Sequence, residues 1–353
     1  MPAFAESAAE PPLADSYYAL LRRDQASNRV DPCTTVVPSA GCQVQQPPVA
    51  ECQLPMIDVG CLTAPGATPQ ERAACTAAIA AAASEWGFFQ VVNHGVRQEL
   101  LDAMRREQVR LFRLPFEAKT TAGLLNDSYR WGSPTATSSR QLSWSEAFHV
   151  PLAGISGNRC SYGELASIRD VTQEVAIAMS KLANTLARVL AESLGHRASS
   201  QFPEGCDERT CFLRLNRYPP CPFLPDAFGL VPHTDSDFLT VLCQDQVGGL
   251  QLMKDSRWVA VKPIPNALIV NIGDLFQAWS NDRYKSVEHK VVTNATTERF
   301  SVAYFLCPSY DSPIGACEEP SPYRTFTFGE YRRRVQEDVK KTGKKIGLPN
   351  FLM

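Results

Sequence analysis

The sequence predicts a mainly β fold with flanking helices, in which a sandwich or jelly-roll core is backed by α-helices. Three observations carry this prediction. From Cys211 onward the apolar residues alternate with a period of two, in about eight short segments separated by turn residues such as Gly248-Gly249. Before Cys211 the apolar residues recur every three to four positions, which is typical of helices. The 353 residues, 44% of them hydrophobic, suffice for a large core in one large β fold or in two domains.

The charge balance disfavours several classes of protein. The chain has 35 Lys and Arg against 37 Asp and Glu, a net charge of −2, so we expect no dedicated binding of nucleic acid. No apolar run approaches the ~18 residues of a transmembrane helix. Acidic residues stand where a signal peptide would be basic. We therefore expect no membrane insertion, a cytoplasmic location with the nucleus as a second compartment, and a monomer or weak homo-oligomer.

The twelve cysteines are scattered and form no Cys-x-x-Cys pair. This pattern disfavours a zinc ribbon or a thioredoxin-like site. Because no export signal is evident, we expect reduced thiols, several of them small buried apolar residues.

Four regions follow one another along the chain. Residues 1–50 are rich in Pro, Ala, Ser and Gln and are expected to be a loosely ordered leader. Residues 51–205 are expected to form a helical and strand region that packs on the core. The jelly-roll core itself is expected at 206–310, and a C-terminal helix and tail at 311–353.

The region before the core begins with strands and helices in alternation. Thr68 is predicted to cap a helix that continues to about Trp86, with Pro69 in its first turn and Glu71 completing a capping box. The regular apolar stripe of the last helix favours packing on a sheet over a dimer seam. The other elements expected here are strands at 54–59 and 87–92 and helices at 100–115 and 168–194.

The core is predicted from period-two segments. One helical turn is expected at 275–279, capped by Asp274, which follows Gly273. A charged helix near 329–340 is expected to cover one end of the core. The predicted strands are 212–218, 229–234, 238–243, 250–253, 257–262, 267–272, 286–292 and 299–306.

Two of the five histidines lie in strand-like sequence with an acid or charge nearby. His233 and Asp235 share a face of an extended segment, because side chains alternate along a strand. His289 lies in a second such segment. Two histidines and one carboxylate inside a β barrel suit non-haem Fe(II). The His-x-Asp motif alone is a weak signal, since a buried histidine paired with an aspartate shows the same pattern.

The strand around Arg299 strengthens the case for an iron site. Arg299 and Ser301 share one face, where an unpaired inward guanidinium would be costly. Its planar fork matches a carboxylate. A dicarboxylate co-substrate could chelate iron with one end and pair with Arg299 and Ser301 with the other. Asn216 and Tyr218 share a face of an earlier strand and could position the same ligand.

These motifs resemble those of the plant 2-oxoglutarate- and Fe(II)-dependent dioxygenases, and the resemblance covers about residues 54–340. It implies a double-stranded β-helix core, with O₂ as the second co-substrate and ascorbate as the reductant. It also implies that His233, Asp235 and His289 bind iron, while Arg299, Ser301 and Tyr218 hold 2-oxoglutarate. The motifs that carry it are 216–220, 233–235, 247–251 and the Arg299-x-Ser301 pair.

Within this family, the longest similarities are to gibberellin 2-oxidases of the subclass that acts on twenty-carbon gibberellins. The chain lacks the Leu-Pro-Trp-Lys-Glu-Thr stretch of gibberellin 20-oxidases and has Thr234 where those carry Cys. The resemblance implies 2β-hydroxylation of a gibberellin, which inactivates the hormone, with decarboxylation of 2-oxoglutarate to succinate and CO₂. The similar stretches are 128–132, 143–151, 228–237 and 345–350.

An apolar diterpenoid substrate needs an aromatic and aliphatic pocket and a partner for its carboxylate. His149 is expected to border this pocket, His94 to be a scaffold residue and His196 to be exposed. The expected pocket residues are Trp131, Arg140, Trp144 and Tyr304.

Alternative functions stay open at this point. The same chemistry could act on another gibberellin position or on a flavonoid-like molecule. A non-catalytic jelly-roll binder or a zinc hydrolase could use the same three metal ligands. The Arg299 and Ser301 pair argues against the hydrolase, because simple hydrolysis needs no dicarboxylate.

Overall fold

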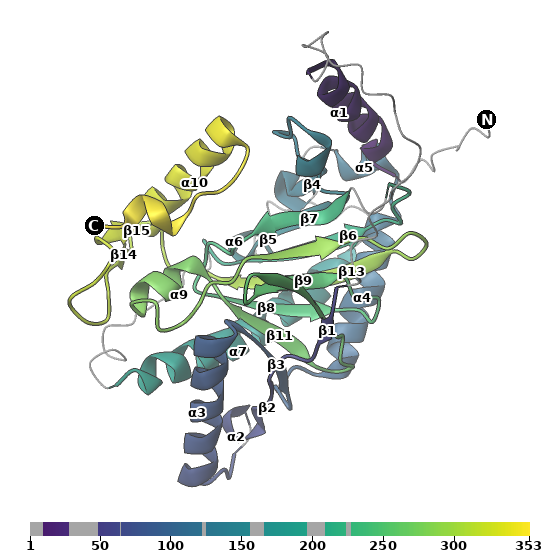
Figure 1. Ribbon diagram of the computed structural model, residues 1–353. Coiled ribbons are helices and arrows are strands. Elements are labelled where there is room, and N and C mark those ends of the chain that lie inside the picture. The colour runs from purple at the N-terminus through teal and green to yellow at the C-terminus, as the bar shows by residue number, and fades with distance from the viewer. Residues whose placement is uncertain are drawn as a thin grey trace.

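Two β-sheets form the centre of the molecule, and helices surround them (Figure 1). The computed structural model describes residues 10–27, 49–63, 65–121, 125–155, 166–195, 209–223 and 227–353. This arrangement confirms the predicted mainly β fold with a jelly-roll core and flanking helices.

The larger sheet has eight strands. In spatial order they are β2 (Met56–Asp58), β3 (Phe88–Val92), β11 (Leu268–Ile272), β8 (Leu239–Gln244), β13 (Arg299–Leu306), β6 (Phe212–Tyr218), β5 (Glu146–Pro151) and β4 (Tyr129–Trp131). The smaller sheet has five, in the order β1 (Glu51–Cys52), β10 (Arg257–Val261), β9 (Leu250–Lys254), β12 (His289–Val292) and β7 (Phe228–His233). A separate hairpin pairs β14 (Pro313–Ile314) with β15 (Phe326–Thr327).

The eight core strands predicted from the alternation are all present. The bounds of β6 and β13 agree with the prediction to the residue, whereas β12 begins at His289 rather than at 286. The alternation also separates two faces. Leu213, Leu215, Val302 and Tyr304 join the apolar cluster on the helical side of the larger sheet. Their neighbours in sequence face the space between the two sheets, where the candidate site lies.

Helices pack on the larger sheet and confirm three of the predicted elements. They are α3 (Pro69–Glu85), α4 (Gln98–Phe112) and α7 (Ala166–Ser193). The N–H of Glu71 donates to Thr68 Oγ1 at 3.2 Å, and the N–H of Thr68 donates to the Glu71 carboxylate at 2.8 Å, which completes the predicted capping box. The apolar stripe of α7 is buried against α3, α4 and the sheet, as predicted.

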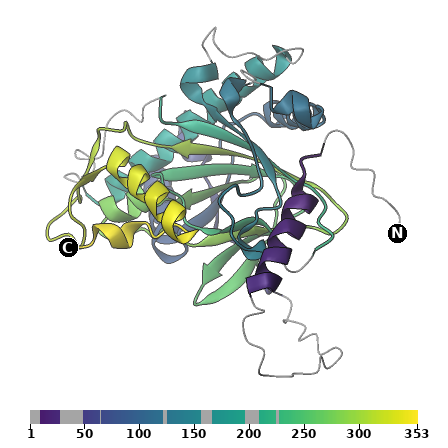
Figure 2. The ribbon, with the colours of Figure 1, turned by 90° about the horizontal axis from the view of Figure 1, so that it is seen from above.

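The remaining helices lie at the ends of the sheets. The charged helix α10 (Phe328–Thr342) and the short α9 (Asp274–Trp279) were both predicted. Figure 2 shows α10 and α1 (Leu13–Ser27) on either side of the sheets. The short helices are α2 (Gly60–Thr63), α5 (Phe116–Lys119) and α6 (Leu152–Ile155), with 3₁₀ turns at Leu125–Asp127, Ser139–Gln141 and Leu348–Phe351.

The prediction of a loosely ordered leader is wrong for α1. Three apolar residues at helical spacing form its buried face, and Tyr17 stacks on Phe223 with ring centres 4.1 Å apart. The rest of the helix is mostly polar, so overall composition concealed this narrow stripe. Residues 1–9 and 28–48 of the leader lie outside the described residues. The buried face of α1 consists of Leu13, Tyr17 and Leu20.

Glu10, just before α1, joins a buried ionic network. The guanidinium of Arg217 on β6 donates to both carboxylate oxygens of Glu10, at 2.8 and 3.1 Å. It also donates to Glu146 at 2.7 Å and to Glu298 at 2.9 Å. A buried guanidinium needs such partners, because an unpaired charge in the interior is strongly destabilising. The network therefore ties the segment before α1 to the larger sheet.

We expect Tyr17→Ala to lower the free energy of unfolding by about 3 kcal/mol, because it removes a buried aromatic ring and its stacking contact with Phe223. Tyr18→Ala is the matched control, since Tyr18 is 49% exposed and meets Phe223 only edge-on. Its expected cost is about 1 kcal/mol or less. Urea unfolding of both variants measures the difference, and equal losses would contradict the packing role of Tyr17.

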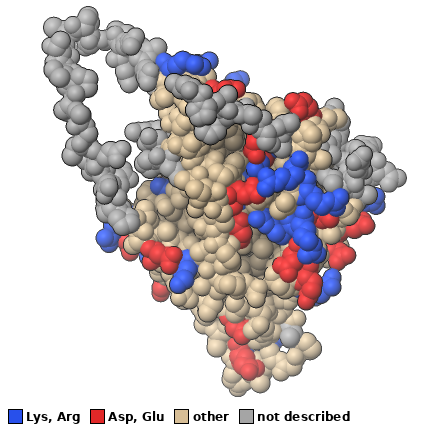
Figure 3. Space-filling model, turned by 90° about the vertical axis from the view of Figure 1, so that its right-hand side faces the viewer, with Lys and Arg blue, Asp and Glu red and all other residues tan. Residues whose placement is uncertain are grey.

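The surface carries both signs of charge. On the face drawn in Figure 3, basic side chains gather in one area with acidic side chains at its border. Ion pairs at the surface include Arg110 with Glu107 at 3.0 Å and Arg283 with Glu318 at 2.6 Å. Among the described helices, none combines the length and the apolar character that crossing a bilayer requires.

Candidate active site

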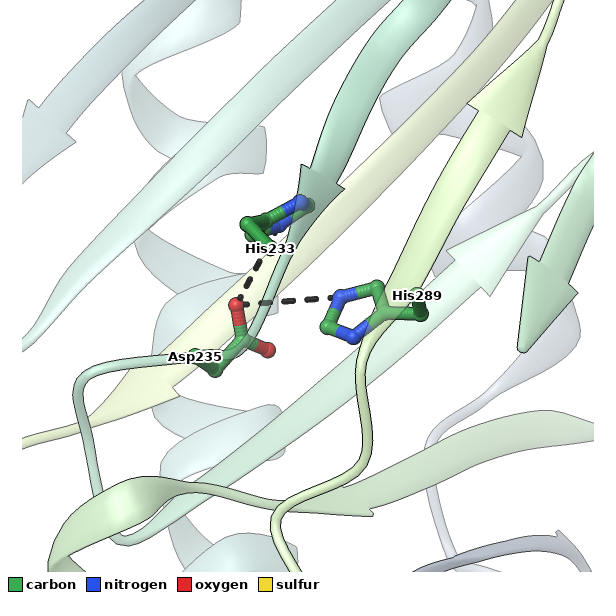
Figure 4. A group of neighbouring side chains, drawn as sticks. All are labelled: His233, Asp235 and His289. Carbon is green, nitrogen blue, oxygen red and sulfur yellow. Dashed lines mark ion pairs between the residues drawn. The ribbon is translucent and has the colours of Figure 1, made fainter. Parts of the chain in front are cut away.

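His233, Asp235 and His289 converge between the two sheets (Figure 4). His233 ends β7 and lies opposite His289, which begins β12. The turn after β7 brings Asp235 back toward both imidazoles. Its Oδ1 atom lies 3.7 Å from Nε2 of His233 and 3.9 Å from Nε2 of His289. One ligand atom from each residue therefore lies within 4.8 Å of the other two, a spacing that suits a single metal ion.

Hydrogen bonds to the backbone fix the orientation of both imidazoles. Nδ1 of His233 lies 2.8 Å from the carbonyl oxygen of Val231, and Nδ1 of His289 lies 3.0 Å from that of Val287. A carbonyl only accepts, so each Nδ1 carries a proton, and in the neutral tautomer that this hydrogen bond selects, Nε2 is the nitrogen with the free lone pair. Such contacts set the tautomer that a metal-binding histidine needs.

Asp235 is held by two donors on its other oxygen. Thr240 donates its hydroxyl to Oδ2 at 2.6 Å, and Asn271 donates its amide at 2.7 Å, so Oδ1 is left facing the histidines. Burial by itself raises the pKa of Asp235, but the two histidines and these hydrogen bonds outweigh it and lower the pKa to about 2. Burial, followed by the nearby His289, lowers the pKa of His233 to about 3. A carboxylate and neutral imidazoles are the states that bind a divalent metal.

A second buried carboxyl group lies beside this site. Asp237 Oδ2 is 2.9 Å from the Thr240 hydroxyl, and its Oδ1 has no partner among the described residues. Burial, followed by the charge of Asp235, raises the pKa of Asp237 well above its usual range. Asp237 therefore supports Thr240 beside the candidate metal ligands. Gly273 permits this arrangement, because a Cβ there would lie 2.2 Å from the backbone oxygen of Asp237.

The predicted co-substrate residues face the same cavity from β6 and β13. Arg299 lies opposite Tyr218, and Ser301 lies opposite Asn216. The Arg299 side chain is buried. Its Nη2 donates to Gln244 Oε1 at 2.8 Å, but Nε and Nη1 have no partner among the described residues. Two free donors on a buried guanidinium fit a carboxylate ligand, because a buried charge without a partner is costly.

Neighbouring side chains order this part of the cavity. The Asn216 amide donates to Ser301 Oγ at 3.3 Å, and the Arg299 guanidinium lies over the ring of Tyr218, 5.0 Å from its centre. From α4, Gln108 donates to the backbone oxygens of both Asn216 and Ser301, at 3.0 and 2.9 Å. The structure thus brings Asn216, Tyr218, Arg299 and Ser301 together beside the candidate metal ligands, in one cavity of about 370 Å³.

The walls of the cavity are largely aromatic and aliphatic. His149 stacks on Phe212 at 3.8 Å, and Phe212 stacks on Phe305 at 4.4 Å. From α10, Phe328 and Val335 close one side. These surfaces suit an apolar ligand that is larger than 2-oxoglutarate.

The prediction that Tyr304 lines the substrate pocket is wrong. Arg299 and Ser301 face the cavity, so the alternation of β13 directs Ala303 and Phe305 there and turns Tyr304 to the helical side. Trp131 and Trp144 are also absent from the described lining of the cavity. Trp144 is instead buried beneath α1, and its indole N–H donates to the Pro220 carbonyl at 3.2 Å.

Arg140, His94, His149 and His196 were the remaining residues with a predicted position. The side chain of Arg140 and the whole of His196 lie outside the described residues. His149 lines the cavity. His94 is buried, accepts the N–H of Val96 at 3.2 Å and lies 3.3 Å from the Asn266 carbonyl, as a scaffold residue would.

His149 makes the fold sensitive to acid. Burial, followed by Arg214, Arg332 and Arg130, lowers the pKa of His149 to about 3. Below pH 6.5 the unfolded chain takes up a proton that the folded chain does not, so stability falls as the pH falls. At pH 5 this difference in proton uptake lowers the free energy of unfolding by about 2 kcal/mol. We expect His149→Phe, which keeps the stack, to reduce by that amount the loss of unfolding free energy between pH 7.5 and pH 5. An unchanged pH dependence in urea unfolding would contradict this assignment.

Sequence reasoning missed several residues that support the site. Asn271 was detectable, because it is a lone amide in the otherwise apolar strand β11. Gln244 and Thr240 gave no such signal. Lys345 is the most remote: its Nζ donates to the Thr234 carbonyl at 2.9 Å and to Ser236 Oγ at 2.9 Å, on either side of Asp235. Its charge is paired with Asp274 at 2.7 Å.

The chain is similar to known families and to individual proteins over most of its length. Residues 209–308 match the 2OG-Fe(II) oxygenase superfamily, and residues 54–157 match the family "non-haem dioxygenase in morphine synthesis N-terminal". Gibberellin 2-beta-dioxygenase 6 of Oryza sativa subsp. japonica is 69% identical over 359 residues, which cover 99% of this chain and 98% of that protein. Gibberellin 2-beta-dioxygenase 8 of Arabidopsis thaliana is 56% identical over 305 residues, or 86% of this chain and 88% of that protein.

A solved structure with a similar fold is that of JOX2 in complex with 2OG, Fe and JA. It is 34% identical, has a TM-score of 0.73, and the match covers 86% of this chain and 90% of that one.

Proposed function

Because this chain belongs to the 2OG-Fe(II) oxygenase superfamily, we propose that it is a 2-oxoglutarate-dependent hydroxylase that 2β-hydroxylates gibberellins and so inactivates them. One observation carries this proposal: a gibberellin 2-beta-dioxygenase matches the chain at 69% identity over almost its whole length. The enzyme uses Fe(II), 2-oxoglutarate and O₂, with ascorbate as the reductant.

The described residues fit these groups. His233, Asp235 and His289 offer two free Nε2 lone pairs and one carboxylate oxygen to Fe(II). The free Nε and Nη1 donors of Arg299, beside Ser301, are available to a carboxylate of 2-oxoglutarate. Tyr218 and Asn216 line the same part of the cavity. When bound, the iron and its co-substrates supply the oxidising chemistry, which yields succinate, CO₂ and a hydroxylated product.

The protein's own contribution is to position the reacting groups and to exclude water. Thr240 and Asn271 orient Asp235 toward the histidines, and Gln108 holds the strands that carry Asn216 and Ser301 in register. The stack of His149, Phe212 and Phe305 presents an apolar wall to the substrate. A bound diterpenoid that covers this wall would displace water from the reacting centre.

We infer that the substrates are twenty-carbon gibberellin precursors, and that position 2 is attacked from the β face. Incubation of the purified enzyme with a panel of gibberellins, Fe(II), ascorbate and 2-oxoglutarate tests this, with products identified by mass spectrometry and NMR. We expect 2β-hydroxylated twenty-carbon products. Turnover of nineteen-carbon gibberellins alone, or oxidation at carbon 20 or carbon 3, would contradict it.

The same assay distinguishes the alternatives. Hydroxylation of a flavonoid but of no gibberellin would refute the substrate assignment and leave the dioxygenase reaction in place. A lack of succinate formation with every substrate would favour a non-catalytic binder or a zinc hydrolase. The free donors of Arg299 argue against the hydrolase, because simple hydrolysis needs no dicarboxylate.

We further place the enzyme in the cytoplasm, with the nucleus as a second compartment, as a monomer or weak homo-oligomer that binds a small diterpenoid and neither nucleic acid nor membrane. Sedimentation of the purified protein tests the oligomeric state.

A further inference from the structure

Arg214 projects into the cavity from the middle of β6. Its cross-strand partners are His149 on β5 and Ala303 on β13, and all three residues line the cavity. Arg214 lies four residues before Tyr218, which is opposite Arg299. At ~3.3 Å per residue, Arg214 is displaced by ~13 Å along the strands from the row of Arg299. A group bound at Arg214 is therefore separate from the carboxylate bound at Arg299.

Arg332 reaches the same cavity from α10. Its Nη1 donates to the Tyr310 hydroxyl at 2.7 Å, and its guanidinium lies 5.4 Å from the ring centre of Tyr310 and 5.8 Å from that of Phe328. These contacts hold the side chain, and among the described residues no carboxylate pairs with its charge. Arg214 and Arg332 are both near enough to the half-buried imidazole of His149 to help lower its pKa.

The other charged residues described in the cavity lining offer no carboxylate to pair with these two arginines. Lys345 is already paired with Asp274, and Arg299 faces the 2-oxoglutarate position. Of the two described carboxyl groups that line the cavity, Asp235 is a candidate metal ligand and Asp237 contacts the Thr240 hydroxyl at 2.9 Å. Among the described residues, no acidic side chain forms an ion pair with Arg214 or Arg332. The outer part of the cavity therefore carries two positive charges beside an aromatic stack.

We propose that Arg214 and Arg332 together bind a carboxylate of the substrate, and so select apolar polycyclic acids over neutral molecules of the same shape. This inference rests on the proposed function and names the partner of the gibberellin carboxylate. Two guanidinium groups can each donate to a carboxylate oxygen, and the adjacent rings of Phe212 and Phe305 cover the hydrocarbon skeleton. The acid group would anchor the outer end of the substrate while its ring system extends toward the metal ligands.

The test compares Arg214→Gln and Arg332→Gln with Arg333→Gln, whose exposed side chain follows Arg332 on the same helix. Each variant is assayed with a gibberellin that the wild type hydroxylates and with the methyl ester of that gibberellin. For the free acid we expect the KM of the first two variants to rise about tenfold to hundredfold, as for the loss of a charge-assisted hydrogen bond. For the ester the variants and the wild type should be alike. Arg333→Gln should match the wild type with both, and the KM for 2-oxoglutarate should stay within about twofold throughout.

Binding is measured without turnover by equilibrium dialysis of labelled gibberellin under nitrogen, which reports affinity alone. Arg214→Lys, which keeps the charge but loses the planar fork, provides a second variant if Arg214→Gln does not fold. Equal losses with acid and ester would overturn the proposal, since they would indicate packing rather than pairing. A raised KM for 2-oxoglutarate would also overturn it. A wild-type enzyme that hydroxylates no gibberellin refutes the proposed function and this inference with it, whereas an active wild type with unaffected variants refutes the inference alone.

Discussion

His233→Ala, Asp235→Ala and His289→Ala will each abolish hydroxylation while leaving the fold largely intact. Each residue is one of the three protein ligands that we propose for iron, and among the described residues these three form the group that could hold a metal ion. Loss of a residue that merely orients a ligand costs about tenfold to hundredfold in metal affinity or activity, so loss of a ligand should cost more than about a hundredfold. Succinate release, hydroxylated product and iron content of the purified variants measure the effect.

The control for these variants is His94→Gln, which changes a buried histidine whose hydrogen bonds, among the described residues, are to the backbone of Val96 and Asn266. It should keep its iron and its turnover, even if it unfolds more readily. Near-normal succinate production by any of the three ligand variants, with iron retained, would refute the assignment of that ligand.

Replacement of Arg299 will weaken binding of 2-oxoglutarate without loss of iron. Arg299→Lys keeps the charge but loses the planar fork, and a charge-assisted hydrogen bond is worth about 1.5–3 kcal/mol. The half-saturating concentration of 2-oxoglutarate should therefore rise about tenfold to hundredfold, and excess 2-oxoglutarate should recover part of the rate. Arg299→Leu should be worse, because the carboxylate would then be buried without a counter-charge.

Arg217→Lys is the matched control. Arg217 lies on β6 beside the co-substrate residues, but its guanidinium faces the opposite side and is paired with Glu10, Glu146 and Glu298. This variant should lose stability and keep its half-saturation by 2-oxoglutarate. If Arg299 were instead a structural ion-pair residue, both Arg299 variants would lose thermal stability while their half-saturation stayed unchanged, and that result would refute its role in binding.

The parts of the fold that follow a strong period could be predicted from the sequence. The bounds of β6 and β13 were predictable because apolar and polar residues alternate over part of each strand, at 213–216 and at 299–302. The same alternation correctly placed His233 beside Asp235 and Arg299 beside Ser301. Applied further along β13, it would have excluded Tyr304 from the cavity and indicated Phe305.

Other parts depend on contacts between distant segments. The helix α1 is stable only because its narrow apolar face meets Trp144 and Phe223, and no local pattern reveals these partners. Trp144 was misplaced for the same reason, since an aromatic residue in a substrate-like stretch could lie in the pocket or under a helix. The partner of Lys345 could not be predicted, because nothing near residue 345 indicates which loop it supports.

The position of Lys345 in the sequence has a consequence for biosynthesis. Lys345 braces the loop that carries Asp235, yet 111 positions separate it from Thr234. A ribosome that adds about 5–20 residues per second needs on the order of 5 to 20 seconds to reach Lys345 after it has made that loop. During this interval the nascent chain already holds Asp235 but lacks the cation that fixes its neighbours. Iron should therefore enter a fully formed site late in translation or after release, and premature termination before Lys345 should yield chains that incorporate iron poorly.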